Sequence, residues 1–356
     1  MNSVVNNVLN ANPILSNIPT KNVSVGIICS TGLGDTFLQM VIANNLARNG
    51  YQVTFFSDIA HSIAHFVSAY STQKLPHYHS AINAFNKVSV MLYDCASQYL
   101  MQAPNAIVDW LKLNGVGYQM SSGRPDYFIQ TQHFLTQLPD NANSAAEQLI
   151  HFNATIRSPG IGIIRPPLAK QIAWFLQHRI KLADVTADCG LLLQQQNVNA
   201  RKVLIHPSSS KLKKNWPPEN YIALAKRLAS IGYQPVITVA PHERRQWQTL
   251  SNGKIAVPLF KSITELAWFY QDASWLLGND SGNAHLASAM GIPTLQIFGR
   301  WRNSPSWRAG WSKNKVITAN FPYNLSKHHW QSGLSVDRVY QELMDWVDTL
   351  PSGKTH

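Results

Sequence analysis

The chain has few cysteines and no long apolar run. Its three cysteines, Cys29, Cys95 and Cys189, lie far apart without C-x-x-C spacing, so they indicate neither a disulfide framework nor a zinc site. Nowhere does the sequence offer the roughly 18 consecutive apolar residues that cross a bilayer, and its Asn-rich start lacks the basic segment of a signal peptide. We therefore expect a protein of the reducing cytoplasm whose residues 1–21 form a disordered leader.

Acidic side chains are also scarce, and the charge is unevenly distributed. The 356 residues carry a net charge of +12; residues 1–200 hold 11 Lys and Arg against 9 Asp and Glu, whereas residues 201–356 hold 19 against 9. A basic half suits nucleic acid, anionic lipid or a phosphorylated small molecule. Because zinc-finger, basic-zipper and RNP-like patterns are missing, we expect no nucleic-acid partner and favour phosphate recognition, with an anionic membrane surface as a weaker expectation.

Strand-like apolar runs alternate with helical segments in both halves. The first half has strands at 23–29, 51–58 and 87–94 and a helix over about 36–49, but the order of elements in 96–190 is not predicted. The alternation restarts at Arg201. There the pattern predicts strands at 202–207, 234–240, 275–279 and 293–299, and helices at 218–232, from about 242, and at 283–291.

This alternation predicts an α/β protein with two Rossmann-like domains and a central cleft. We place the domains at residues 22–195 and 196–335. The final segment, 336–356, is an amphipathic closing helix and tail that we expect to pack back on the N-terminal domain. Its apolar face comprises Val336, Val339, Leu343, Trp346, Val347 and Leu350. Ligands of such sheets collect at the carboxyl ends of the strands, so residues that follow strands are the candidates for a site.

A glycine turn with an acid follows the first strand. In VGIICSTGLGDTFLQM, residues 25–40, Gly32 and Gly34 precede Asp35 where the predicted helix approaches. A dinucleotide-binding turn needs a third glycine, but Phe37 occupies that position, so the nucleotide motif is weak. Asp35 is then either a carboxylate kept ionised by the helix start or a helix N-cap.

The other three strand ends carry polar and basic residues. LIHPSSSKLKKNWPPENY brings hydroxyls and lysines to a helix start marked by Pro217 and Pro218, which indicates an anion site or a solvated basic loop. Glu243 follows the third strand and suits either a ribose or the next helix. In NDSGNAHLASAMGIPT, a tight turn opens a short helix whose N-terminus suits phosphate, and His285 lies one turn inside. This histidine either faces the cleft or satisfies a backbone carbonyl.

Taken in order, these motifs resemble those of the heptosyltransferases, family-9 glycosyltransferases that add heptose from ADP-heptose to the lipopolysaccharide inner core. The resemblance is carried by the turn with Asp35, by HPSSSKLKKNWPPENY, by APHE and by NDSGNAHLASAMGIPT, and it spans roughly residues 22–350. It implies a GT-B fold in which residues 22–195 bind the acceptor and residues 196–335 bind the nucleotide sugar.

The resemblance also implies roles for single residues. Asp35 takes the place of the general base, Lys214 that of a phosphate ligand and Glu243 that of the ribose acid, while Gly32 and Gly34 lie on the acceptor side. The donor-binding residues that it implies are Ser208, Ser209, Lys214, Glu243, Asp280, Ser281, Gly282 and His285. The sequence contains no Asp-x-Asp pair that could hold a metal on a diphosphate, so we expect neither a metal nor another cofactor.

The predicted activity is thus an inverting, metal-independent transfer of heptose or a related sugar from an ADP-sugar to a lipopolysaccharide core or other saccharide acceptor, at the inner face of the inner membrane. Two alternatives stay open: a sugar-nucleotide epimerase or hydrolase of the same fold, and a non-catalytic sugar-nucleotide or glycan-binding protein.

Two segments depart from the family pattern. The loop 71–86 offers only Lys74, His77 and His79 to an acidic acceptor, and 299–315 is unusually rich in Trp and Arg.

Overall fold

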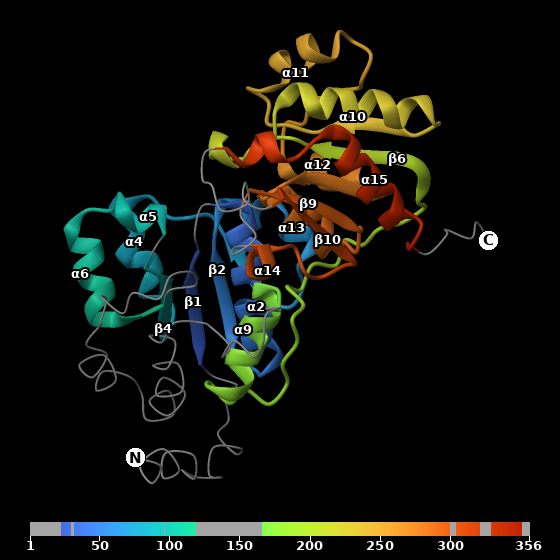
Figure 1. Cartoon of the computed structure of the whole chain (residues 1–356). Helices are drawn as coiled ribbons and strands as arrows, with labels where there is room; N and C mark the ends of the chain where they lie inside the picture. The colour runs from blue at the N-terminus through green and yellow to red at the C-terminus, as the bar shows by residue number, and fades with distance from the viewer. Residues whose placement is uncertain are drawn as a thin grey trace, which may run out of the picture.

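Two parallel β-sheets form the framework of the chain (Figure 1). The computed structural model describes residues 23–29, 32–95, 97–118, 166–299, 304–320 and 329–350. The first sheet has the strand order β3-β2-β1-β4-β5 and the second β10-β9-β8-β6-β7, and the pairings within both are parallel. The predicted α/β architecture with two Rossmann-like domains is confirmed. The predicted leader, residues 1–21, lies outside the described residues.

The first domain is built from the N-terminal elements. Its strands are β1 (Ser24–Ile28), β2 (Gln52–Phe56), β3 (Ser71–Gln73), β4 (Val90–Asp94) and β5 (Gly115–Tyr118). Its helices are α2 (Leu33–Arg48), α3 (Asp58–Ser62), η3 (Ala64–Phe66), α4 (Tyr78–Phe85), α5 (Gln98–Met101), α6 (Asn105–Asn114) and α9 (Leu168–His178). The three strands that the sequence predicts here are present, whereas β3 and β5 were not predicted.

The second domain repeats the alternation. Its strands are β6 (Asn199–His206), β7 (Gln234–Ile237), β8 (Ala273–Asn279), β9 (Thr294–Phe298) and β10 (Asn314–Thr318). Its helices are η5 (Leu212–Lys214), α10 (Pro218–Ser230), α11 (Arg244–Ser251), α12 (Ile263–Tyr270), α13 (Gly282–Ala289), α14 (Ser304–Trp307), η7 (Trp330–Gly333) and α15 (Val336–Val347). Pro218 opens α10, where a missing N–H costs nothing. All four strands predicted here are present.

Helix α2 is buried between the two domains. Every residue from Thr36 to Leu46 is buried, which explains why this helix has no polar face. It contributes to one apolar core together with residues of α9, α12 and α13, and this core extends from the first sheet to the second. The N-terminal turn of α2 is therefore held at the boundary between the domains.

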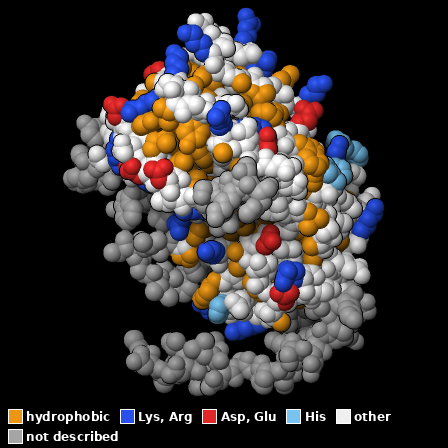
Figure 2. Space-filling model, turned by 90° about the vertical axis from the view of Figure 1, so that its right-hand side faces the viewer, with side chains coloured by type: hydrophobic (Ala, Val, Ile, Leu, Met, Phe, Trp, Pro, Cys, Tyr) orange, Lys and Arg blue, Asp and Glu red, His pale blue; other side chains and the backbone are white. Residues whose placement is uncertain are grey.

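Each sheet has a second face with its own core. Helices α4, α5 and α6 cover the outer face of the first sheet (Figure 1). On the second sheet, α10, α11 and α15 form the corresponding layer. Lys and Arg side chains project from this upper part of the molecule in Figure 2, where α10 and α11 lie in the view of Figure 1. This distribution agrees with the positive charge of residues 201–356.

The closing helix α15 packs on the second domain. Val339, Leu343 and Trp346 belong to the buried cluster that α10 also forms, and Asp337 pairs with Arg227 of α10 at 2.7 Å. The apolar face predicted for this helix is confirmed, but the expectation that it packs back on the N-terminal domain is wrong for its described part. Periodicity identifies the buried face of a helix; it does not identify the partner.

The segment between α9 and β6 runs along α2 before it enters the second domain. Asn44 Nδ2 donates to the Asp188 carbonyl at 3.0 Å and Asn45 Nδ2 to that of Thr186 at 2.8 Å. Further on, the Gln195 N–H donates to the Met290 carbonyl at 2.7 Å. These contacts fix the connecting segment to both domains beside the contact of α2 with α13.

Candidate active site

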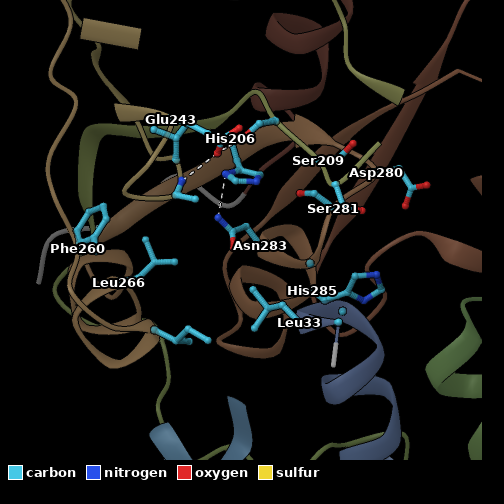
Figure 3. Close-up of a pocket in the computed structure, with 18 of the residues that line it drawn as sticks. Leu33, His206, Ser209, Glu243, Phe260, Leu266, Asp280, Ser281, Asn283 and His285 are labelled. Atoms are coloured by element: carbon cyan, nitrogen blue, oxygen red, sulfur yellow. Dashed lines mark hydrogen bonds between the residues drawn. The ribbon is translucent and has the colours of Figure 1, made fainter. Parts of the chain in front are cut away.

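A cavity of about 640 Å³ lies between the carboxyl ends of the two sheets. We call it the interdomain cavity. Figure 3 shows Glu243, Phe260 and Leu266 on one side of it and Asp280, Ser281 and His285 on the other. The sequence-predicted site residues all line it, namely Gly32, Gly34, Asp35, Ser208, Ser209, Lys214, Glu243, Asp280, Ser281, Gly282 and His285. Residues from four separate strand ends thus meet in one place.

Asp35 projects from the first turn of α2. Gly32 occupies the N-cap position, so Asp35 is the third residue of the helix and not its cap. The helix begins three residues before the predicted start, since Leu33, Gly34 and Asp35 already belong to it. Asp35 is partly exposed and lines the interdomain cavity. The N-cap interpretation of this acid is therefore wrong, and the carboxylate lies where a ligand of the cavity can reach it.

A buried polar group anchors α2 beneath Asp35. One turn further along the helix, Gln39 Nε2 donates to Asp94 Oδ2 at 2.9 Å, and the Tyr118 hydroxyl donates to Gln39 Oε1 at 2.9 Å. Asp94 ends β4 and Tyr118 ends β5. Because these side chains are buried, their hydrogen bonds tie the helix firmly to the sheet. The position of Asp35 is thereby set by the sheet itself.

The two domains approach each other through two glycines. A Cβ atom on Gly282 would lie 2.7 Å from the Gly34 backbone nitrogen and 2.6 Å from Leu33 Cβ. A Cβ on Gly34 would lie 3.0 Å from His285 Cδ2. The glycine turn therefore permits close packing of the first turns of α2 and α13. This contact brings two helix N-termini, with their positive dipole ends, to the same side of the cavity.

The basic loop after β6 places one lysine in the cavity. Lys214 Nζ lies 2.6 Å from Asp280 Oδ2, with 41% and 19% of the two side chains exposed. Lys211 and Lys213 are exposed, whereas Lys214 is only partly so and belongs to the cavity wall. The interpretation of this loop as merely solvated thus fits Lys211 and Lys213. Lys214 is available to an anion that can compete with Asp280.

Glu243 is held by two donors. Its Oε2 accepts hydrogen bonds from the Ser208 hydroxyl at 3.0 Å and from the Ala240 backbone N–H at 3.1 Å. Glu243 occupies the N-cap position of α11, but its side chain does not cap that helix. The buried hydroxyl of Ser208 therefore positions the Glu243 carboxylate. The sequence indicates only that Ser208 belongs to the site of the nucleotide sugar.

The turn into α13 brings two buried polar atoms to the cavity. Ser281 Oγ and His285 Nδ1 are buried and have no hydrogen-bond partner among the described residues. Burial lowers the pKa of His285 to about 4, although the nearby Asp280 acts in the opposite direction. The imidazole is hence neutral near pH 7. His285 lines the cavity, as one of its two interpretations has it, and the Trp307 backbone lies near its ring.

Several wall residues were not predicted from the sequence. His206 Nδ1 lies 2.6 Å from the Thr238 carbonyl oxygen and 2.8 Å from Asn283 Nδ2, and burial lowers the pKa of His206 below its ordinary value. The motif HPSSSK contains this histidine, so its position at the end of a predicted strand could have identified it as a residue of the site. Among the apolar wall residues, Phe260, Ile263 and Leu266 had no such signal. The wall also includes Leu33, Val239, Pro241 and Trp307.

The described residues include neither a cluster suited to a metal ion nor a helix suited to a membrane. Among these residues, no group of three or more His, Cys, Asp and Glu side chains is arranged to hold a metal ion. Likewise, no helix in the described part of the chain has the length and apolar character needed to span a bilayer.

Comparison with known proteins points to one family. Residues 170–333 match the model of glycosyltransferase family 9 (heptosyltransferase). Lipopolysaccharide heptosyltransferase 1 of Campylobacter coli is 26% identical over an alignment of 159 residues, and the match covers 42% of this chain and 46% of that relative. The chain thus matches just under half of the relative's length.

Solved structures agree in fold over nearly the whole length. The Escherichia coli heptosyltransferase WaaC with ADP superposes with a TM-score of 0.61 at 16% identity, covering 91% of this chain and 99% of that one. The Escherichia coli ADP-heptose lipopolysaccharide heptosyltransferase II gives 0.59 at 14% identity, covering 91% and 98%. The predicted resemblance is therefore confirmed: the chain has a GT-B fold, and its residues 170–333 match the model of glycosyltransferase family 9 (heptosyltransferase).

Proposed function

We propose that this protein is an inverting, metal-independent glycosyltransferase. It moves heptose or a related sugar from an ADP-sugar to a lipopolysaccharide core or another saccharide or glycolipid acceptor. One observation carries the proposal: an acid of the first domain, Asp35, shares a cavity with the lysine, the acid and the helix N-terminus of the second domain that suit a nucleoside diphosphate. The matches to lipopolysaccharide heptosyltransferases support the choice of donor and acceptor.

The wall of the cavity offers, from one end to the other, surfaces that suit the base, the ribose, the diphosphate and the sugar of such a donor. Glu243 and the apolar Phe260 and Leu266 lie on one side (Figure 3), where the carboxylate suits ribose hydroxyls and the apolar wall suits a base. Lys214 and the N-terminus of α13 suit the diphosphate. Asp35 and His285 then lie beside the position of the sugar.

In the proposed reaction, the acceptor hydroxyl oxygen attacks the anomeric carbon of the donor sugar in a single displacement. The bond between that carbon and the phosphate oxygen breaks, and its electron pair leaves with the diphosphate. The proton of the attacking hydroxyl goes to the Asp35 carboxylate. Lys214 and the amides at the start of α13 stabilise the charge on the departing diphosphate. Attack from the face opposite the leaving group inverts the anomeric configuration.

The donor is tested by calorimetry with ADP, GDP, UDP and their sugar conjugates. We expect ADP and ADP-heptose to bind and the guanosine and uridine compounds to bind much more weakly. Tight binding of UDP or GDP in preference to ADP would contradict the proposed donor. ADP release that stays unchanged when acceptor saccharide is added would favour a hydrolase or epimerase instead.

The proposed site of action is the cytoplasmic face of the inner membrane, with peripheral attachment through the basic second domain. Residues 201–356 carry ten more basic than acidic side chains, 19 against 9. We expect the protein to float with vesicles that contain anionic lipid and to be released as salt is raised. Equal recovery with neutral vesicles would remove this part of the proposal.

A further inference from the structure

Trp307 lines the interdomain cavity but takes no part in the proposed reaction steps. It ends α14 and lines the interdomain cavity, and its side chain is only partly buried. The Trp307 backbone lies near the His285 ring, and that ring packs against Gly34, so Trp307 lies at the end of the cavity where His285 meets the first turn of α2. The opposite end, with Glu243 and Phe260, is the one that suits the nucleoside.

The backbone beside Trp307 is fixed by side chains of the second domain. The Ala309 N–H donates to Gln296 Oε1 at 2.7 Å, and Gln296 is itself buried in β9. The N–H groups of Trp311 and Ser312 both donate to Ser288 Oγ, at 3.0 and 2.9 Å. These hydrogen bonds leave the segment little freedom to move. A wall residue held in this way can present a preformed surface to a ligand.

A contact between two aromatic rings also supports this part of the cavity wall. The Trp311 ring packs edge-on against the His285 ring, with 5.8 Å between ring centroids, and Trp311 Nε1 donates to the Ala187 carbonyl at 2.7 Å. Trp311 therefore has its indole N–H satisfied and serves as packing behind His285. Trp307 differs from it because it belongs to the wall of the cavity.

We propose that Trp307 is the specificity-determining surface for the transferred sugar, its indole packing against the apolar C–H face of the sugar ring. This inference rests on the proposed function, because it assumes a nucleotide sugar in the interdomain cavity. The diphosphate position at Lys214 and the start of α13 directs the sugar toward Asp35 and His285, and Trp307 adjoins that position. An indole offers a large flat apolar surface at low entropic cost.

The inference is tested with Trp307→Phe and Trp307→Leu and with two ligands, ADP and ADP-heptose. We expect Trp307→Leu to weaken ADP-heptose binding by about 10-fold and to leave the dissociation constant of ADP unchanged. Trp307→Phe should retain most of the affinity, because a flat ring remains. A merely structural role would weaken both ligands alike and would not be rescued by phenylalanine.

Fluorescence and a matched control complete the experiment. ADP-heptose should quench part of the tryptophan emission that ADP leaves unchanged, and this difference should vanish in Trp307→Phe. Trp174→Leu is the control, since Trp174 is also partly buried against the same core but lies on α9 away from the cavity wall; its ligand affinities should match those of the unchanged protein.

The outcomes separate this inference from the proposed function. If the unchanged protein binds neither ADP nor ADP-heptose, the proposed function fails. If it binds both and Trp307→Leu loses neither affinity nor the quenching difference, the role of Trp307 is overturned while the proposed function stands. If Trp307→Leu instead raises the KM of the acceptor alone, the indole contacts the acceptor and the assignment to the transferred sugar is overturned.

Discussion

Replacing Asp35 by alanine should lower kcat by about 1,000-fold, the usual contribution of a general base, with almost no change in ADP affinity. The reason is the separation of roles across the cavity. Asp35 belongs to α2 of the first domain, whereas Lys214, Glu243 and the start of α13 belong to the second. A base that acts on the acceptor hydroxyl contributes to the transition state and not to the binding of the nucleotide.

The control for this prediction is Asp58→Asn. Asp58 is also an acid in the first turn of a helix of the first domain, but it is exposed and does not belong to the cavity wall. We expect its turnover to be unchanged. Turnover is measured as ADP release that depends on acceptor, and affinity by calorimetry. If Asp35→Ala also lost its affinity for ADP, the assignment of the domains to acceptor and donor would be wrong.

Lys214→Ala should weaken ADP binding by about 10- to 100-fold, which is typical for loss of a charge-assisted contact to an anion. Removing this lysine also leaves the Asp280 carboxylate without the ammonium group that lies 2.6 Å away. That carboxylate would then repel the diphosphate. The remaining binding should depend less on salt concentration, because one cation fewer contacts the ligand.

Lys213→Ala is the matched control for the lysine. The two residues are neighbours in η5, but Lys213 is exposed, and the contact it makes to Trp330 uses its backbone carbonyl. We expect ADP affinity close to that of the unchanged protein. Equal loss in both variants would indicate a diffuse basic surface, and no loss in Lys214→Ala would show that the loop is merely solvated.

The sequence predicts the polar part of the site well for a physical reason. In a parallel α/β sheet, the carboxyl ends of the strands lie at one edge, so a residue that follows a strand is placed near that edge once the strand is identified. Asp35, Lys214, Glu243 and Asp280 each follow a buried strand whose apolar run is clear in the sequence. Their convergence follows from the topology.

The apolar part of the site could not be predicted in the same way. Phe260 precedes α12 and Leu266 belongs to it, a helix that the alternation of strands and helices does not reveal. Trp307 lies in a segment that only its composition sets apart. Tertiary contacts determine such packing partners, and the periodicity of apolar residues along the chain does not specify them. The same limit explains α15: its buried face is evident from the sequence, but its position against α10 is not.

The glycines of the first turn have a role that their spacing does not reveal. Gly32 and Gly34 have the spacing of a nucleotide-binding turn, but Phe37 in place of the third glycine makes that motif weak. Gly32 caps α2, and Gly34 lies against Gly282 of the other domain. The spacing reflects a close contact between two helices, which is a property of the assembled pair of domains and not of the loop alone.

In the proposed enzyme, one carboxylate of the first domain faces the sugar of a nucleotide held by the second. A crystal structure of the protein with a non-transferable ADP-heptose analogue would show this arrangement. We expect the diphosphate against Lys214 and the start of α13, the ribose at Glu243, and Asp35 beside the anomeric carbon on the side away from the diphosphate. A nucleotide bound elsewhere, or an Asp35 side chain directed into solvent away from the sugar, would show that Asp35 is not the base of this reaction.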